Sequence, residues 1–285
     1  MSDRQAARGI IMTHPKNIFD ELKKNRQKTP FEKELDRIER EEQKLERQAV
    51  AYRAAKWKET LEQKIPPRVY TNLQKAFCMA FELIFEKGTG IIEKTYAKDT
   101  IEKDFQVHDF AVSLKGGKKE LRDLKADVNR TNLVNMAVST VEGIGLGVLG
   151  IGLPDIVLFL SVILKGTYVT ALQYGFSYDT PDERRYILKV LETAMSKGER
   201  WKVCNEAVDN CFCAEYLDET KLSEQIRSTA DAFAVDMLLA KFIQGLPVAG
   251  ILGGISNPVY YARIMHYVQL KYHKRYLLLK SATPL

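Results

Sequence analysis

The segment from Val141 to Tyr178 constrains the fold of this chain more than any other stretch. Its first half is dense in glycine, and its second half is the longest strongly apolar run in the sequence. Glycine has no side chain, so another helix or an acyl chain can approach its backbone closely. We therefore predict a packing or membrane-facing element here, with these contact residues: Gly145, Gly150, Gly152, Pro154 and Asp155.

A second uncharged stretch lies nearer the carboxyl terminus. Residues 242–262 contain no charged side chain, and residues 143–164 contain only Asp155. Each stretch is long enough to cross a bilayer. However, both contain proline and several glycines, and the mean hydropathy of the whole chain is -0.25. We expect buried central helices, able to insert into a membrane or to line an apolar cavity, rather than permanent transmembrane helices.

Charge is distributed unevenly along the chain. The formal net charge is +6, and no acidic residue follows Asp236. The basic residues after that point are Lys241, Arg263, Lys271, Lys274, Arg275 and Lys280. Such an asymmetry favours an anionic partner, either phospholipid headgroups or nucleic acid. No helix-turn-helix or RNA-binding pattern accompanies the basic residues, so we do not expect nucleic acid binding.

The helix predicted after Pro258 carries a stripe that combines positive charge with tyrosine. Tyrosine beside cations suits the headgroup region of an anionic membrane, so we predict that this stripe binds lipid or a partner. The alternative is a core helix with a solvated basic edge. With Asn257 at the start of the helix, the candidate binding residues are Arg263, Tyr267, Lys271, Lys274 and Arg275.

The chain shows no convincing alternation of apolar and polar residues, so we predict an all-α, multi-helix globular bundle. We divide it into a flexible segment (1–30), a charged helical extension (31–64) and a helical domain (65–280). The extension has opposite charges three or four residues apart, which stabilises an exposed helix. It lies along the main body or, alternatively, forms a coiled-coil arm that makes an oligomer.

Several helix boundaries are marked in the sequence. Residues 68–88 keep the period of a buried helix face, and we predict that this helix stops at Gly88. Thr180 is a predicted cap, with Pro181 at the first helical position and Glu183 closing a capping box. Pro258, after the predicted cap Asn257, and Pro154 open two further helices by the same reasoning.

No motif in the sequence identifies a reaction, a metal or a cofactor. The glycines at 145, 147 and 150 spell G-x-G-x-x-G, but Pro154 follows four residues later and no acidic ribose partner follows, so we do not expect a dinucleotide site. The cysteines and histidines lack metal-binding spacing. Asp155 is either a first-turn helix carboxylate or a buried acid or general base, so we leave enzymatic activity open.

The sequence favours a cytoplasmic location. Its four cysteines are too few and too irregularly spaced for a disulfide framework, which indicates a reducing compartment. The amino-terminal segment has no apolar stretch of the length that a signal peptide needs. We therefore expect a cytoplasmic protein, peripheral to the membrane.

Two groups of residues resemble the EcsC protein family. The first is the run Gly152–Ile156, followed by Tyr174–Phe176 and the Pro181 helix start, and the second is the glycine-rich segment Gly245–Ile264 with Asn257. Val157 departs from the pattern, because a second proline is expected there. The resemblance covers about residues 65 to 280 and leaves the charged helix outside. It implies an α-helical fold and brings no catalytic residue.

Our leading hypothesis is a membrane-associated helical protein that binds lipid or a membrane-protein partner. The glycine-rich segments make the apolar contact, and the basic carboxy-terminal helix orients it. One alternative is an enzyme of unknown reaction centred on Asp155. Another is a scaffold or oligomerisation protein that uses residues 31–64.

Overall fold

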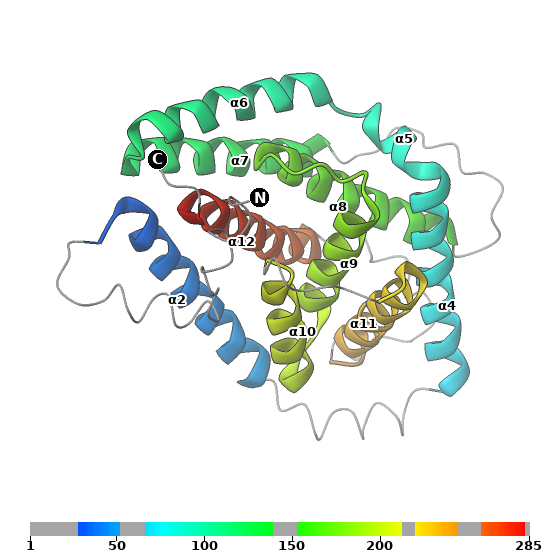
Figure 1. Cartoon of the computed structure of the whole chain (residues 1–285). Helices are drawn as coiled ribbons and strands as arrows, with labels where there is room; N and C mark the ends of the chain where they lie inside the picture. Colours follow the sequence, from blue (N-terminus) through cyan, green and yellow to red (C-terminus); the bar gives the residue numbers. More distant parts are fainter. Residues whose placement is uncertain (1–27, 52–65, 139–152, 213–219, 244–257, 283–285) are drawn as a thin grey trace, which may run out of the picture.

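The computed structural model describes residues 28–51, 66–138, 153–212, 220–243 and 258–282. Every regular element within these residues is a helix, which confirms the predicted all-α fold (Figure 1). The elements are α2 (Pro30–Ala51), α4 (Pro67–Leu83), the π-helical turn η2 (Ile84–Gly88), α5 (Thr89–Glu93), α6 (Lys98–Lys115), α7 (Lys118–Val138), α8 (Leu153–Gln173), α9 (Pro181–Met195), α10 (Gly198–Asn210), α11 (Leu222–Ile243) and α12 (Pro258–Ala282).

Helices α8 and α12 pack against each other, and most other helices pack on one of them. α4, α6 and α7 contact α8, while α2, α7 and α9 contact α12. α11 packs on both α4 and α9, and α10 packs on α9. Figure 1 shows α12 passing through the middle of this arrangement. Much of the core between α4, α8 and α11 is aromatic, because Phe77, Phe81 and Phe159 all pack their rings against Phe233.

Helix α8 is the apolar centre that the sequence predicts. Among the described residues it is the one helix with the length and composition to cross a membrane, yet most of Ile156–Gln173 is buried inside the protein. Its Gly166 faces α12, where an added Cβ would lie 2.6 Å from the Tyr261 hydroxyl oxygen. The expected buried central helix is thus confirmed for α8, while most of residues 242–262 lie outside the described residues.

The carboxyl end of α8 requires a glycine. Gly175 has φ +80°, and its N–H donates to the Leu172 carbonyl (2.9 Å) while the Phe176 N–H donates to the Ala171 carbonyl (2.9 Å). These two bonds form a Schellman motif, in which glycine is favoured at the left-handed residue. A Cβ on Gly175 would also lie 2.3 Å from the Phe105 ring of α6. The tyrosine-glycine-phenylalanine sequence therefore ends α8 and allows the Phe105 ring of α6 to pack closely against that end.

The predicted helix over residues 68–88 is confirmed, but its predicted end is wrong. Leu73, Phe77 and Phe81 are buried, as the period requires. At Gly88 the backbone stays in the right-handed helical region, with φ −88° and ψ −22°. The helical path continues through η2 and α5 to Glu93, because the apolar face also continues and Ile92 is buried.

Helix α9 begins where the sequence predicts, although only half of the predicted capping box forms. The Thr180 side chain accepts a hydrogen bond from the Glu183 N–H (3.2 Å), and Pro181 occupies the first turn. The Glu183 carboxylate does not close the box. It instead accepts hydrogen bonds from Tyr272 and Arg275 of α12, so its side chain joins two helices.

The described part of the charged extension, α2, lies along the main body. Leu35, Ile38 and Ala49 on one face are buried, and the helix contacts α10 and α12. This confirms the first of the two predicted arrangements for residues 30–51. The apolar face of α2 is therefore covered by the same chain and does not need a second copy, whereas residues 52–65 lie outside the described residues.

Candidate functional site

The structure places only part of the predicted apolar contact. Gly145, Gly150, Gly152 and Asn257 lie outside the described residues. Pro154 and Asp155 lie in the first turn of α8, which confirms the predicted helix start. The binding roles assigned to these residues, and the catalytic alternative for Asp155, stay predictions.

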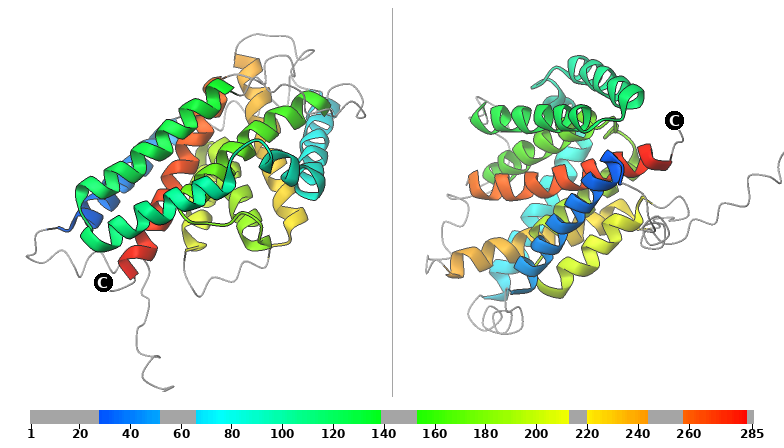
Figure 2. Two further views of the ribbon diagram at one scale, coloured as in Figure 1. Left: turned by 90° about the horizontal axis from the view of Figure 1, so that it is seen from above. Right: turned by 90° about the vertical axis from the view of Figure 1, so that its left-hand side faces the viewer.

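The helix ends that flank the two glycine-rich segments lie together on one side of the molecule. α7 and α11 end there, and α8 and α12 begin there (Figure 2). This side is at the top of the left-hand view and at the left of the right-hand view. Residues 139–152 connect α7 to α8, and residues 244–257 connect α11 to α12. Both glycine-rich segments are thus anchored at one side of the described structure.

The stripe predicted on α12 is not an open basic surface, because its side chains pair with other parts of the chain, although the Arg263 side chain is still 36% exposed. The Lys271 side chain is 0% exposed, and its ammonium group contacts the carboxylates of Glu42 and Asp209. Lys274 binds the same two carboxylates, at 2.8 Å from Glu42 Oε2 and 2.9 Å from Asp209 Oδ2. Burial opposes ionisation of Asp209, but the two ammonium groups outweigh it and lower the Asp209 pKa.

The next residue of the stripe, Arg275, is held by α9. Its guanidinium group lies 2.7 Å from Glu183 Oε2, and the Tyr272 hydroxyl donates to Glu183 Oε1 at 2.6 Å. The same guanidinium group lies over the rings of Phe176 and Tyr186, at 4.1 and 4.6 Å from their centroids. Arg275 thus combines a buried ion pair with cation–π contacts, which fixes its position inside the bundle.

The first part of the stripe is also paired internally. Arg263 lies 2.6 Å from Asp236 Oδ2 of α11, and Lys197 lies 3.3 Å from Asp236 Oδ1. Burial lowers the Lys197 pKa. The hydroxyl of Tyr267, which is buried, donates to Asn205 Oδ1 at 2.7 Å. The five predicted stripe residues therefore bind other parts of the same chain.

The prediction of a basic surface on α12 failed because the carboxylates that pair with its side chains come from other helices. Glu42, Glu183, Asp209 and Asp236 lie on α2, α9, α10 and α11, and they balance the acid-free terminus only in the folded protein. One signal was present in the sequence. Glu42 is spaced from Leu35, Ile38, Leu45 and Ala49 so that it shares their apolar face, where an ionised carboxylate needs a cationic partner.

A second buried polar network joins α4, α9, α10 and α11. Asp231 accepts hydrogen bonds from Tyr70, Gln74 and Arg200, and Arg200 also lies 2.9 Å from Glu192 Oε1. Ser228 and Gln225 donate to the Glu192 carboxylate, each at 2.7 Å. These groups pair with one another, and the network links the four helices.

The surroundings of the thiol beside this network oppose its ionisation. Cys204 Sγ lies 3.6 Å from Glu192 Oε1, and burial together with that carboxylate raises the Cys204 pKa to about 11. A nucleophilic cysteine instead needs a lowered pKa. Among the described residues, no group of three or more His, Cys, Asp or Glu side chains is arranged to hold a metal ion directly.

Two exposed surfaces on the described helices were not predicted. Val107, Phe110 and Leu114 are 68%, 65% and 68% exposed along one face of α6. A hollow of about 230 Å³ lies between α2 and α7, and four of the residues that line it are basic. These are Arg37, Lys118, Arg122 and Lys125. Their positive charge is only partly offset by Glu34, which pairs with Lys125 at 3.2 Å.

Comparison with known proteins agrees with the resemblance seen in the motifs. The family model described as the EcsC protein family matches residues 31–277, so the similarity includes α2 and extends beyond the predicted range. Protein EcsC of Bacillus subtilis (strain 168) is 26% identical over 219 residues, which are 75% of this chain and 82% of that protein. No solved structure is significantly similar to the chain. The chain belongs to the EcsC protein family.

Proposed function

We propose that the protein is a cytoplasmic, peripheral membrane protein that binds lipid or a membrane-protein partner through its two glycine-rich segments. The observation that carries the proposal is the common location of the four helix ends that flank these segments (Figure 2). Residues 143–152 and 244–257 contain no charged side chain. Two uncharged segments anchored at one side provide a combined apolar contact larger than either offers alone.

A separate basic contact is proposed in place of α12, in the hollow between α2 and the first half of α7, away from the side where α7 ends. Neutralising α12 residues is not a test of lipid binding, because each of these side chains has an internal partner. Arg37, Lys118 and Arg122 are exposed, so they are available to phosphate groups. Their electrostatic attraction to an anionic surface weakens with salt, whereas apolar contact through the glycine-rich segments does not.

The experiment that tests the proposal is flotation of the purified full chain with neutral and with anionic liposomes, at low and moderate salt. We expect binding to both vesicle types, stronger on anionic ones at low salt. The double variant Gly147→Asp/Gly250→Asp places a charge in each segment and is expected to abolish binding to both. Gly90→Asp is the matched control, because an added Cβ at Gly90 meets no atom within 4 Å.

Two further sets of variants test the basic hollow and the exposed face of α6 in the same flotation assay. Arg37→Gln/Arg122→Gln is expected to remove only the salt-sensitive preference for anionic vesicles, and Lys33→Gln, an exposed position outside the hollow, is its control. Phe110→Ser tests the exposed face of α6. If Phe110→Ser abolishes flotation while the glycine double variant does not, the contact lies on α6 and the proposal is wrong. A protein that neither floats nor carries lipid by mass spectrometry contradicts direct lipid binding and leaves the membrane-protein partner.

A further inference from the structure

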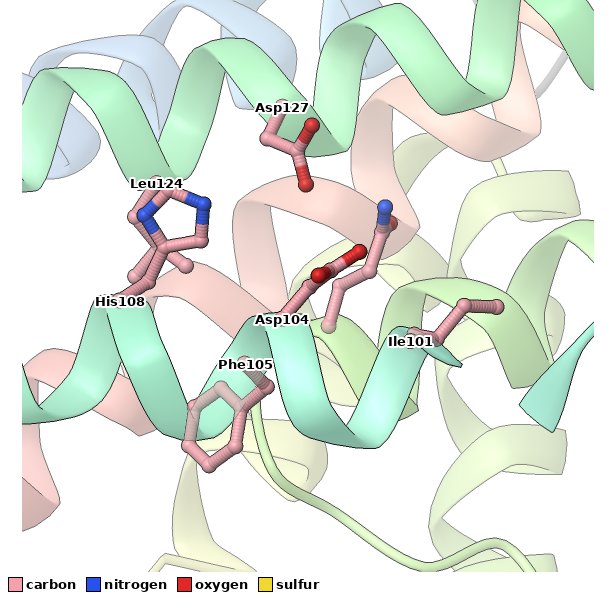
Figure 3. Close-up of a pocket in the computed structure, with 7 residues that line it drawn as sticks. Ile101, Asp104, Phe105, His108, Leu124 and Asp127 are labelled. Atoms are coloured by element: carbon pink, nitrogen blue, oxygen red, sulfur yellow. The ribbon is translucent and has the colours of Figure 1, made fainter. Parts of the chain in front are cut away.

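A cavity of about 80 Å³ lies where α6, α7 and α8 meet. It is lined by Ile101, Asp104, Phe105, His108, Leu124, Asp127 and Gln173. Figure 3 shows the Asp104 carboxylate of α6 and the Asp127 carboxylate of α7 directed toward one another, with the Phe105 ring turned away from them. His108 is drawn apart from them, beside Leu124.

The negative charge in this lining comes from the two carboxylates. An ionised carboxylate has only acceptors, and the Gln173 amide adds a carbonyl acceptor. None of the lining residues is a lysine or an arginine. The hollow between α2 and α7 is the opposite case, because basic side chains dominate its lining. The cavity at α6, α7 and α8 is thus suited to a cation.

An independent observation points to a ligand in the same place. Gln173, at the carboxyl end of α8, lines the cavity and is only 5% exposed. Its Oε1 atom is buried and has no hydrogen-bond partner within the described part of the structure. Buried polar atoms are nearly always satisfied, so an orphan carbonyl oxygen beside two carboxylates indicates a missing electropositive partner.

We propose that this cavity binds a hard divalent cation of the Mg²⁺ or Mn²⁺ type, through the carboxylates of Asp104 and Asp127 and the Oε1 atom of Gln173. Carboxylate and amide oxygens are the ligands that such cations prefer. Mg²⁺ commonly keeps several waters and uses one or two protein carboxylates, which suits a site without three acidic or histidine ligands. At about 30 Å³ for each water, the cavity of about 80 Å³ has room for about two or three waters.

The site would connect helices that are separate in sequence. Asp104 lies on α6, Asp127 on α7 and Gln173 on α8. A bound cation neutralises the facing carboxylates and ties the α6–α7 pair to the central helix. Binding to the folded state alone raises its stability by mass action, so the cation is expected to raise the melting temperature of the full chain.

The test is titration of the metal-free full chain with Mn²⁺, followed by the loss of the electron paramagnetic resonance signal of free Mn²⁺. We expect one site per chain, from which Mg²⁺ displaces Mn²⁺. Asp104→Asn and Asp127→Asn are each expected to weaken Mn²⁺ binding on the order of 10-fold or more. Asp99→Asn and Asp123→Asn are matched controls on the same two helices, at exposed positions outside the cavity, and should bind like the parent chain.

Gln173 is tested by a pair of substitutions with opposite expected results. Gln173→Leu removes the orphan oxygen and should weaken binding, while Gln173→Glu adds a third carboxylate and should strengthen it. Asp104 is exposed, so its variant keeps the test valid if a Gln173 variant fails to fold. Equal Mn²⁺ affinity of the parent chain and Asp104→Asn overturns the proposal, as does displacement of Mn²⁺ by spermidine but not by Mg²⁺, which would indicate an organic amine site.

Discussion

Helices α8 and α12 are both central, pack on each other, and became buried for different reasons. α8 is apolar along most of its length, and its burial follows from composition. α12 has buried apolar residues but also carries five basic side chains from Arg263 to Lys280, and the packed bundle accommodates these cations because α2, α6, α9, α10 and α11 supply carboxylates to them. A buried apolar helix can thus be recognised from its own sequence. A buried helix with charged side chains can be recognised only once the helices that supply the opposite charges are known.

The comparison also separates two kinds of stability. Contacts of α8 depend on shape, since Gly166 allows α12 to approach closely. Contacts of α12 depend on ion pairs, whose desolvation cost is offset only while every partner is present. Removal of one carboxylate should therefore be more harmful than most changes of shape.

The largest expected effect comes from Glu183→Ala. This change leaves Arg275 and Tyr272 without their shared acceptor in the interior. Loss of one partner of a buried pair costs about 3–5 kcal/mol, so the free energy of unfolding in urea should fall by that amount. Asp182→Ala is the matched control, because that side chain is 86% exposed, and its cost should be about 1 kcal/mol or less. Equal losses for the two variants would contradict an ion-paired interior for α12.

An intermediate effect is expected from pH, through His273 of α12. Burial, with smaller contributions from Lys125 and Arg37, lowers the His273 pKa from 6.5 to about 3. Between these values the unfolded chain binds a proton that the folded chain does not. Stability should therefore fall as pH decreases below about 6.5, by up to about 1.4 kcal/mol per pH unit, or about 2 kcal/mol by pH 5.

The measurement is urea unfolding at a series of pH values for His273→Phe and the parent chain. Phenylalanine keeps the stacking on the Tyr174 ring, whose centroid lies 5.5 Å from that of His273, and does not titrate. His266→Phe is the control, because the His266 side chain is 50% exposed. An unchanged acid slope in His273→Phe would show that this buried imidazole does not couple α12 to pH.

The smallest effect is expected where α8 meets α12. Gly166→Ala places a Cβ 2.6 Å from the Tyr261 hydroxyl oxygen and 2.9 Å from Met265 Sδ. Overpacking costs about 1–3 kcal/mol, and the better helix propensity of alanine offsets about 1 kcal/mol, so a net loss of about 1 kcal/mol should appear in urea unfolding. Gly90→Ala, with open space around it, should instead be neutral or stabilising.

A second substitution identifies the cause of that loss. Tyr261→Phe removes the first atom that the new Cβ meets, and the Tyr261 hydroxyl has no hydrogen-bond partner within the described residues. Gly166→Ala/Tyr261→Phe should therefore recover part of the lost stability. If the double variant recovers no stability, the clash between the added Cβ at position 166 and the Tyr261 hydroxyl is not the cause of the loss.

Much of the fold was predictable from local sequence, and the candidate site was predictable only in part. The cap at Thr180 and the helix starts at Pro154 and Pro258 are confirmed, because they depend on neighbouring residues. The cavity with Asp104, Asp127 and Gln173 was missed, since its members come from three helices and form no motif.

The sequence by itself determined that the chain is helical, that an apolar helix beginning at Leu153 is central, and that the chain resembles the EcsC family. These properties depend on periodicity, composition and short motifs, which are local. Only the tertiary structure decided where the positive charge of α12 is used. Glu42 and Lys271 are 229 residues apart, so their pairing depends on how distant helices pack, and a pattern within one helix does not contain that information.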